Sequence, residues 1–229
     1  MSLYLWIIFG TITGPFFLSF DRKVHFYTYW KSVFLAIILV GTFFIIWDAY
    51  FTSHSIWGFT DKYILGMSFF GLPLEECLFF LVVPYACLFI HEVLKAYFPN
   101  IKTALLGKVF AFAFGMSGLL FSSLYINKWY TLTACSLASL LVIGFAFTAK
   151  VKWFGNFAFT YLVALIPFLI VNGILTGFFT PEPVVWYSED HIIGWRIGSI
   201  PFEDLYYNLC MLLPIIAIHE WMNKKKATV

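Results

Sequence analysis

Seven long apolar stretches limit what this 229-residue chain can fold into. Short polar segments separate them, and they cover approximately residues 3–20, 31–51, 72–94, 104–124, 130–149, 157–179 and 201–222. An apolar run of about 18 or more residues is typical of a transmembrane helix, because lipid offers no partner for a free peptide group. Only 11% of the residues are charged, against about a quarter in a soluble domain, and the mean hydropathy is +0.87. The sequence therefore predicts an all-α integral membrane protein with seven transmembrane helices.

Lysine and arginine are distributed unevenly between the two sides of these helices. Eleven of the 14 follow helices one, three, five and seven: Arg22, Lys23, Lys31, Lys95, Lys102, Lys108, Lys150, Lys152, Lys224, Lys225 and Lys226. The positive-inside rule then places the N-terminus outside and the C-terminus in the cytoplasm of a multi-pass cell-membrane protein surrounded by lipid. The net charge of +2 gives no reason to expect nucleic acid as a partner.

Several unusual features of the sequence recur at an offset of 128 residues. They are Pro73 and Pro201, Glu75-Glu76 and Glu203-Asp204, and His91-Glu92 and His219-Glu220. We interpret this pattern as two three-helix repeats, residues 1–98 and 128–229, joined by a linker helix within residues 99–127. Because the offset spans four helices, an even number, the repeats are expected to be parallel. Both acidic pairs then lie at the outer membrane face.

Each acidic pair begins a helix that is otherwise apolar. Proline suits the first turn of a helix and the helix dipole favours acids there, so an isolated pair would need no other explanation. A second pair at the matching position favours a functional site. Asp48 and Asn172 are expected at the same depth, and Asn208 shares a helix face with Asp204. Ionisable groups at membrane depth normally face the interior of a helix bundle.

Carboxyl groups that are buried together provide an acid and a base. Burial and a like-charged neighbour keep one carboxyl protonated while its partner stays ionised. Phe79 and Tyr207, which follow the acids, are candidates to line a pocket where ring faces stabilise a cation. No phosphate loop, dinucleotide fingerprint or haem motif is present, so no cofactor is expected. The residues predict a dry acid/base site for a lipophilic substrate, and leave open whether the two pairs form one site or two.

The histidines give no familiar metal-binding pattern. His54 and His191 belong to different halves of the chain and lack zinc-like spacing, so no metal is expected. His91 and His219 lie 16 residues beyond the acidic pairs, about 24 Å along a helix. We interpret them as anchors at the cytoplasmic interface, where histidine complements the helix dipole.

The acidic motifs resemble those of the integral-membrane lycopene cyclases, which include heterodimeric bacterial subunits, their fused forms and the cyclase part of fungal bifunctional enzymes. The PxE[ED] element of that family is present as Pro73-Leu74-Glu75-Glu76 and as Pro201-Phe202-Glu203-Asp204. The resemblance implies an isomerase (an intramolecular lyase) that closes the linear ends of lycopene to β-rings without net redox change. It implies lycopene and other carotenoids as ligands, and other enzymes of carotenoid biosynthesis as candidate partners.

The resemblance also suggests roles for the residues. Glu75 and Glu203 match the family's fixed glutamate and are expected to transfer protons. Glu76 and Asp204 complete the catalytic set, which Asp48, Asn172 and Asn208 are expected to orient. The alternative function is a proton-coupled carrier of a small hydrophobic molecule, because buried acids also serve proton relays.

Overall fold

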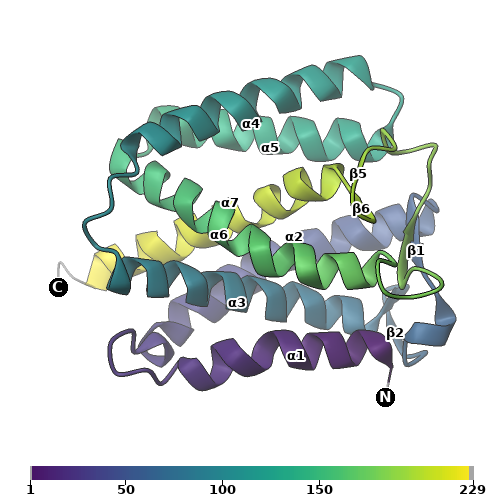
Figure 1. The fold of residues 1–229 in the computed structure, drawn as a ribbon, viewed down its shortest axis with the longest axis horizontal. Helices are drawn as coiled ribbons and strands as arrows, with labels where there is room; N and C mark the ends of the chain where they lie inside the picture. The colour runs from purple at the N-terminus through teal and green to yellow at the C-terminus, as the bar shows by residue number, and fades with distance from the viewer. Residues whose placement is uncertain (1, 227–229) are drawn as a thin grey trace.

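Seven long α-helices, joined by short connections, make up most of the protein (Figure 1). The computed structural model describes residues 2–226, with side chains described through residue 224. The helices are α1 (Leu3–Leu18), α2 (Trp30–Ser53), α3 (Leu74–Tyr97), α4 (Ala104–Leu124), α5 (Trp129–Thr148), α6 (Val151–Leu175) and α7 (Glu203–Lys226). Two short 3-10 helices, η1 (Phe26–Tyr29) and η2 (Asp61–Tyr63), precede and follow α2. The predicted all-helical class is confirmed.

Three two-stranded antiparallel sheets lie at the end of the bundle where α3 and α7 begin (Figure 1). Their strands are β1 (Trp57–Phe59), β2 (Ser68–Phe69), β3 (Leu72–Pro73), β4 (Val185–Tyr187), β5 (Arg196–Ile197) and β6 (Ile200–Pro201). We call this end the acid end, and the opposite end, where α7 ends, the lysine end.

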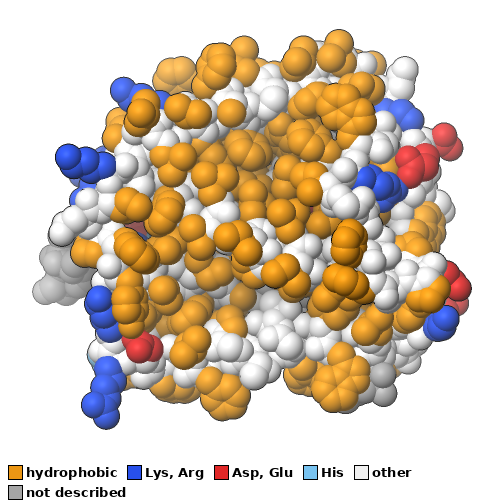
Figure 2. Space-filling model, in the orientation of Figure 1, with side chains coloured by type: hydrophobic (Ala, Val, Ile, Leu, Met, Phe, Trp, Pro, Cys, Tyr) orange, Lys and Arg blue, Asp and Glu red, His pale blue; other side chains and the backbone are white. Residues whose placement is uncertain are grey.

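The apolar surface of the helices suits a lipid environment. Four helices, α3 to α6, and the segment Phe26–Ser53 that contains α2 are long and apolar enough to cross a membrane. Helix α1 is apolar but has only 16 residues. Figure 2 shows hydrophobic side chains over the middle of one face, with charged side chains gathered toward its two ends. These features are consistent with a membrane protein, and the crossing of all seven helices stays a prediction.

Helices α3 and α7 start about two residues later than the apolar stretches predict. The preceding residues instead form hairpins, in which β3 pairs with β2 and β6 pairs with β5. Gly71 and Gly198 have positive φ angles of 80° and 65° between these strands, a conformation that glycine adopts without strain. Each hairpin leads directly into a helix whose first turn carries two acids.

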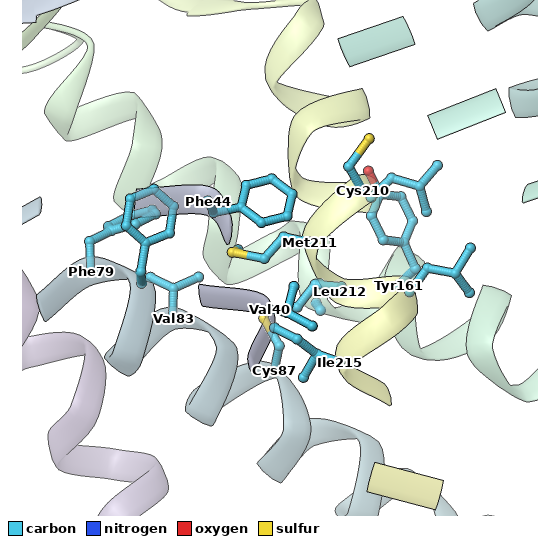
Figure 3. Close-up of a cluster of buried hydrophobic side chains, with 14 of the residues drawn as sticks. Val40, Phe44, Phe79, Val83, Cys87, Tyr161, Cys210, Met211, Leu212 and Ile215 are labelled. Atoms are coloured by element: carbon cyan, nitrogen blue, oxygen red, sulfur yellow. The ribbon is translucent and has the colours of Figure 1, made fainter. Parts of the chain in front are cut away.

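The helices interlock across the two halves of the chain. Helix α1 packs on α3 and α5 packs on α7, whereas α2 packs mainly on α7 and α6 packs on α3. Figure 3 shows the apolar cluster in this region, with Val40 of α2, Val83 of α3, Tyr161 of α6 and Met211 of α7. This arrangement brings α3 and α7, the two helices that carry the acidic pairs, to the centre of the bundle.

Helix α4 packs on α5 and α6, and its contact with α6 depends on glycine. A Cβ atom added at Gly107 would lie 2.9 Å from the Cα of Gly155, and one added at Gly155 would overlap the carbonyl oxygen of Thr103. Small residues let helix backbones approach closely inside membranes. Helix α4, predicted as a linker, is thus packed closely against the second half of the chain.

Gly155→Ala should therefore destabilise the protein by about 1–3 kcal/mol, because the added methyl group forces the two backbones apart. The measurement is thermal unfolding of the purified protein in detergent. Gly144→Ala is the matched control, since no atom lies within 4 Å of its added Cβ. Equal unfolding temperatures for the two variants would contradict the close packing of α4 and α6.

Candidate active site

The first acid of each pair, Glu75 and Glu203, is fully buried and fastens a loop to a neighbouring helix. One oxygen of each carboxyl accepts two hydrogen bonds, one from a hydroxyl and one from a backbone N–H. The donors are Ser2 Oγ (2.5 Å) and Leu65 N (2.7 Å) to Glu75, and Thr131 Oγ1 (2.6 Å) and Ile193 N (2.6 Å) to Glu203. The second oxygen of each carboxyl has no partner among the described residues. The two halves of the chain thus hold their first acids in the same way.

The second acid of each pair, Glu76 and Asp204, is bound by a tyrosine near the start of the first helix of its half, α1 or α5. Tyr4 of α1 donates to Glu76 Oε2 at 2.5 Å, and Tyr130 of α5 donates to Asp204 Oδ1 at 2.6 Å. Both carboxyls are buried. Adjacent residues at the start of a helix point about 100° apart, since a turn contains 3.6 residues. The first and second acids of each pair therefore have different surroundings.

Glu76 and Asp204 line one cavity at the acid end. Asp48 of α2 and Asn172 of α6 also line it, as do Phe79 and Tyr207, whereas Glu75 and Glu203 do not. The second acids of the two pairs thus share one cavity, and the first acids lie outside it.

The acids of the cavity differ in their hydrogen bonds. Asp204 Oδ2 accepts from Asn172 Nδ2 at 2.6 Å and from Tyr187 OH at 3.1 Å, in addition to the bond from Tyr130. Asp48 accepts one long bond of 3.5 Å from Tyr207 OH, and its Oδ2 has no partner among the described residues. Asp204 is therefore well supplied with donors, and Asp48 is not.

Aromatic rings form one wall of the cavity. The Trp57 ring centre lies 5.0 Å from that of Tyr130, 5.9 Å from that of Tyr207 and 6.1 Å from that of Tyr187. Tyr130 and Tyr187 stack at 5.8 Å. Burial, followed by the nearby Asp204 carboxylate, raises the pKa of Tyr187 well above its usual range. Tyr187 therefore remains a neutral hydrogen-bond donor.

A small sheet built from both halves closes the cavity at the acid end. Strand β1 pairs with β4, and residues 57, 59, 185 and 187 face the cavity while Trp186 lies on the opposite side of the sheet. Gly58 lies opposite Trp186, and any Cβ there would overlap the indole ring. This sheet forms one side of the cavity.

The lycopene cyclase family matches residues 1–94 and 127–222 of this chain, which together are most of its length. The chain belongs to the lycopene cyclase family. The two matched segments contain α1–α3 and α5–α7 and leave out α4.

One characterised relative of this family member is a bifunctional lycopene cyclase/phytoene synthase from the fungus Leptosphaeria maculans. It is 38% identical over 66 residues, which are 29% of this chain. The aligned part is only 11% of the fungal protein's length. No solved structure matches the chain.

The structure of this lycopene cyclase family member brings most of the predicted site residues together. Asp48, Asn172, Phe79 and Tyr207 line the cavity with the second acids. Asn208 does not line it: this residue is fully buried, and neither atom of its amide group has a partner among the described residues.

Six aromatic residues that line the cavity were not predicted from the sequence: Tyr4, Trp57, Phe59, Tyr130, Phe168 and Tyr187. Tyr4 and Tyr130 hold equivalent acids but lie 126 residues apart, so the offset of 128 does not align them. Trp57 and Tyr187 come from loops and reach the cavity only through the pairing of β1 with β4. An alignment of the two halves that allowed a two-residue gap would have found the tyrosine pair.

The interpretation of His91 and His219 as interface anchors is wrong. They are 2% and 0% exposed, and each binds a glutamate from the other half of the chain. Burial against partners from the opposite half is a tertiary arrangement that the position of a histidine in its own helix does not indicate.

Thr131→Val should destabilise this family member by about 1–3 kcal/mol, because it removes the only hydroxyl donor that the described residues offer to the buried Glu203 carboxyl. The control is Thr133→Val in the same helix, whose hydroxyl bonds only to carbonyls of α5 itself. The control should change stability by less than about 0.5 kcal/mol. Thermal unfolding in detergent measures the stability of both variants. If Thr131→Val unfolds at the same temperature as the protein without substitutions, Glu203 does not fasten the loop to α5.

Proposed function

We propose that the protein is a lycopene β-cyclase, which closes the linear ends of lycopene to give γ-carotene and then β-carotene. The observation that carries this proposal is the cavity in which buried acids from both halves of the chain meet aromatic rings. Membership of the lycopene cyclase family supports it. An apolar polyene is a suitable substrate for a cavity inside an apolar bundle.

The reaction needs an acid and a base but no electron carrier. A carboxylic acid protonates the terminal double bond and produces a tertiary carbocation. The neighbouring double bond attacks this carbon and forms a six-membered ring, which moves the positive charge onto the ring. A carboxylate then removes a proton from the ring carbon next to the charge. One proton is added and one is lost, so the reaction is an isomerisation and requires no cofactor.

The hydrogen bonds of the cavity suggest which carboxyl has which role. Three donors stabilise Asp204 as an anion, which suits a base or a counter-ion to the carbocation. Asp48 and Glu76 share the cavity with few donors, and two neighbouring carboxyls in an apolar site hold one proton between them. We assign the acid to this pair and the base to Asp204.

Glu75 and Glu203, expected from the family resemblance to transfer protons, do not line the cavity. Each ties the start of its helix to a loop and to the start of α1 or α5, which fixes the direction of the adjacent second acid. Their role is then to position Glu76 and Asp204. Replacement of either residue should still abolish ring formation, because a small displacement of a reacting group greatly slows a reaction.

The aromatic wall has a role in the charged intermediate. The ring faces of Trp57, Tyr130, Tyr187 and Tyr207 offer negative π density to a nearby cation. Such stabilisation is strongest where water is excluded. The sheet of β1 and β4 forms one side of the cavity.

A proton-coupled carrier is the less favoured function. The bundle between the cavity and the lysine end is packed with apolar side chains, among them Val83, Cys87 and Leu212 (Figure 3). Within residues 2–226 this layer contains no carboxyl, imidazole or ammonium group. A relay that moves protons through a membrane uses a chain of such groups. The acids are therefore better suited to exchange protons with a bound molecule.

The distribution of lysines supports a proposed orientation of the protein in the cell membrane. The acid end, with the N-terminus and the cavity, faces outward, and the lysine end faces the cytoplasm. Two parallel three-helix repeats, residues 1–98 and 128–229, joined by a linker helix, account for the matching contacts of the acids in the two halves.

Expression of the full chain in bacteria that accumulate lycopene tests the function. Cells that make a β-cyclase should change from red to orange-yellow, and chromatography should show β-carotene. A strain that stays red while containing the protein in its membranes would exclude the cyclase and favour a carrier or scaffold.

Asp48→Asn, Glu76→Gln and Asp204→Asn should each lower ring formation at least 100-fold, because each removes a group that donates or accepts the proton. Glu75→Gln and Glu203→Gln should also abolish it. Asp61→Asn is the control: this acid lies outside the cavity at the same end of the bundle and is exposed. Pigment extraction, with membrane levels checked by immunoblot, measures the effect. Full β-carotene formation by all three cavity variants would refute the assignment.

One cavity also predicts that the two ends of lycopene react in turn. The second acids of both pairs line the same cavity, so the second end has to enter after the first has reacted. γ-Carotene should therefore accumulate before β-carotene in a time course with membranes and lycopene. The appearance of β-carotene without any earlier γ-carotene would argue for simultaneous cyclisation of the two ends.

A further inference from the structure

A second cluster of ionisable side chains is buried between α3 and α7 at the lysine end. His91 Nε2 lies 3.0 Å from Glu220 Oε1, and His219 Nε2 lies 3.0 Å from Glu92 Oε1. Each bond joins the first half of the chain to the second. The two histidines and Glu92 are less than 5% exposed, and the Glu220 side chain is 13% exposed. The proposed cyclisation at the acid end uses none of these residues.

Each imidazole ring is also held by a helix other than α3 and α7. His91 Nδ1 is 2.8 Å from Thr160 Oγ1 of α6, and His219 Nδ1 is 3.1 Å from Ser32 Oγ of α2. Ser32 and Thr160 are themselves 128 residues apart, so this support is present in both halves. A histidine that binds a metal ion through one ring nitrogen usually has the other nitrogen held in this way. A hydroxyl can accept from Nδ1–H as well as donate to Nδ1, so the support persists when Nε2 binds a cation.

The cluster has an unbalanced negative charge. Lys95 Nζ lies 2.7 Å from Glu92 Oε1 and 2.5 Å from Glu220 Oε1, and it supplies one positive charge for two carboxylates. The position that matches Lys95 in the second half is Asn223, which is neutral. Counted over His91, Glu92, Lys95, His219 and Glu220 alone, with neutral imidazoles, the net charge is −1, which is unfavourable in a buried site. A divalent cation in place of the ammonium group would balance both carboxylates.

We propose that His91, Glu92 and Glu220 bind a divalent first-row transition-metal ion, with His219 orienting Glu92. Candidate ligand atoms of these three residues lie within 4.8 Å of one another. Metal bonds to nitrogen and oxygen are about 2.0–2.2 Å long, so the ligands of a tetrahedral ion are about 3.4 Å apart. The most widely spaced ligand atoms therefore have to approach each other by up to about 1.4 Å to complete the site. One imidazole and two carboxylates suit Zn²⁺.

Lys95 would leave the site when the ion binds. Its side chain is 36% exposed, so the ammonium group has a short path to solvent. The ion would then join the lysine ends of α3 and α7, whose opposite ends carry the acids of the cavity.

Zinc binding by the full-length protein in detergent tests this site. After removal of metals with a chelator and addition of ZnCl₂, elemental analysis should find about one Zn²⁺ per chain. Glu220→Gln should weaken binding, measured by calorimetry, at least tenfold, since it removes one charged ligand. His54→Gln should bind as the unchanged protein does, because His54 is exposed at the acid end. Gel filtration and thermal unfolding establish that each variant is folded.

The variant Lys95→Met distinguishes a metal site from a simple salt-bridge network. It keeps all the proposed ligands. It should bind Zn²⁺ at least as tightly as the unchanged protein, because the competing ammonium group is gone. Less than about 0.1 Zn²⁺ per chain in both proteins would overturn the proposal. Binding by Lys95→Met alone would also overturn it, because the ammonium group would then be the resident cation. Equal binding by Glu220→Gln and the unchanged protein would place the ion elsewhere. None of these measurements depends on ring formation.

Discussion

The burial of four carboxyl groups at the starts of α3 and α7 governs the acid end of this protein. A buried carboxyl is tolerated only where donors reach it, and inside an apolar bundle those donors have to come from other segments of the chain. Hydroxyls of α1 and α5 and backbone N–H groups of two loops serve Glu75 and Glu203, and two tyrosines serve Glu76 and Asp204. The bonds that make these acids tolerable also fasten the surrounding helices and loops in place. The fold and the candidate site therefore depend on the same hydrogen bonds.

The correspondence between the two halves is close but incomplete. The positions at which the halves differ give the cavity two chemically different sides. Asp48 has Thr176 at the matching position, and Asn172 has Phe44. Glu76 therefore shares the cavity with an additional carboxyl, that of Asp48. Asp204 instead has an additional amide donor, that of Asn172. A fully symmetric cavity would give its acids the same protonation tendency. In the proposed mechanism, this asymmetry would let one side donate a proton and the other accept it.

Sequence reasoning was strongest where one segment suffices to define a feature. The apolar stretches predicted the long helices, and the offset of 128 residues identified the paired acids before any contact was known. It failed where two distant segments meet. Tyr4 and Tyr130 were hidden by a two-residue difference in spacing, Trp57 and Tyr187 depend on the pairing of β1 with β4, and Asn208 lies outside the cavity despite sharing a helix with Asp204.

By itself the sequence determined that the chain forms long apolar helices with an acidic pair at the start of two of them. Both properties are local: apolar stretches satisfy their own peptide groups as helices, and proline with acids marks a helix start. Only the tertiary structure decided that α2 and α6 pack on the central helix of the opposite half. That crossing brings the second acids of the two pairs, Glu76 and Asp204, into one cavity and pairs each buried histidine with a glutamate of the other half. The physical reason is that such contacts depend on how distant helices pack together, which the spacing of residues along one helix does not encode.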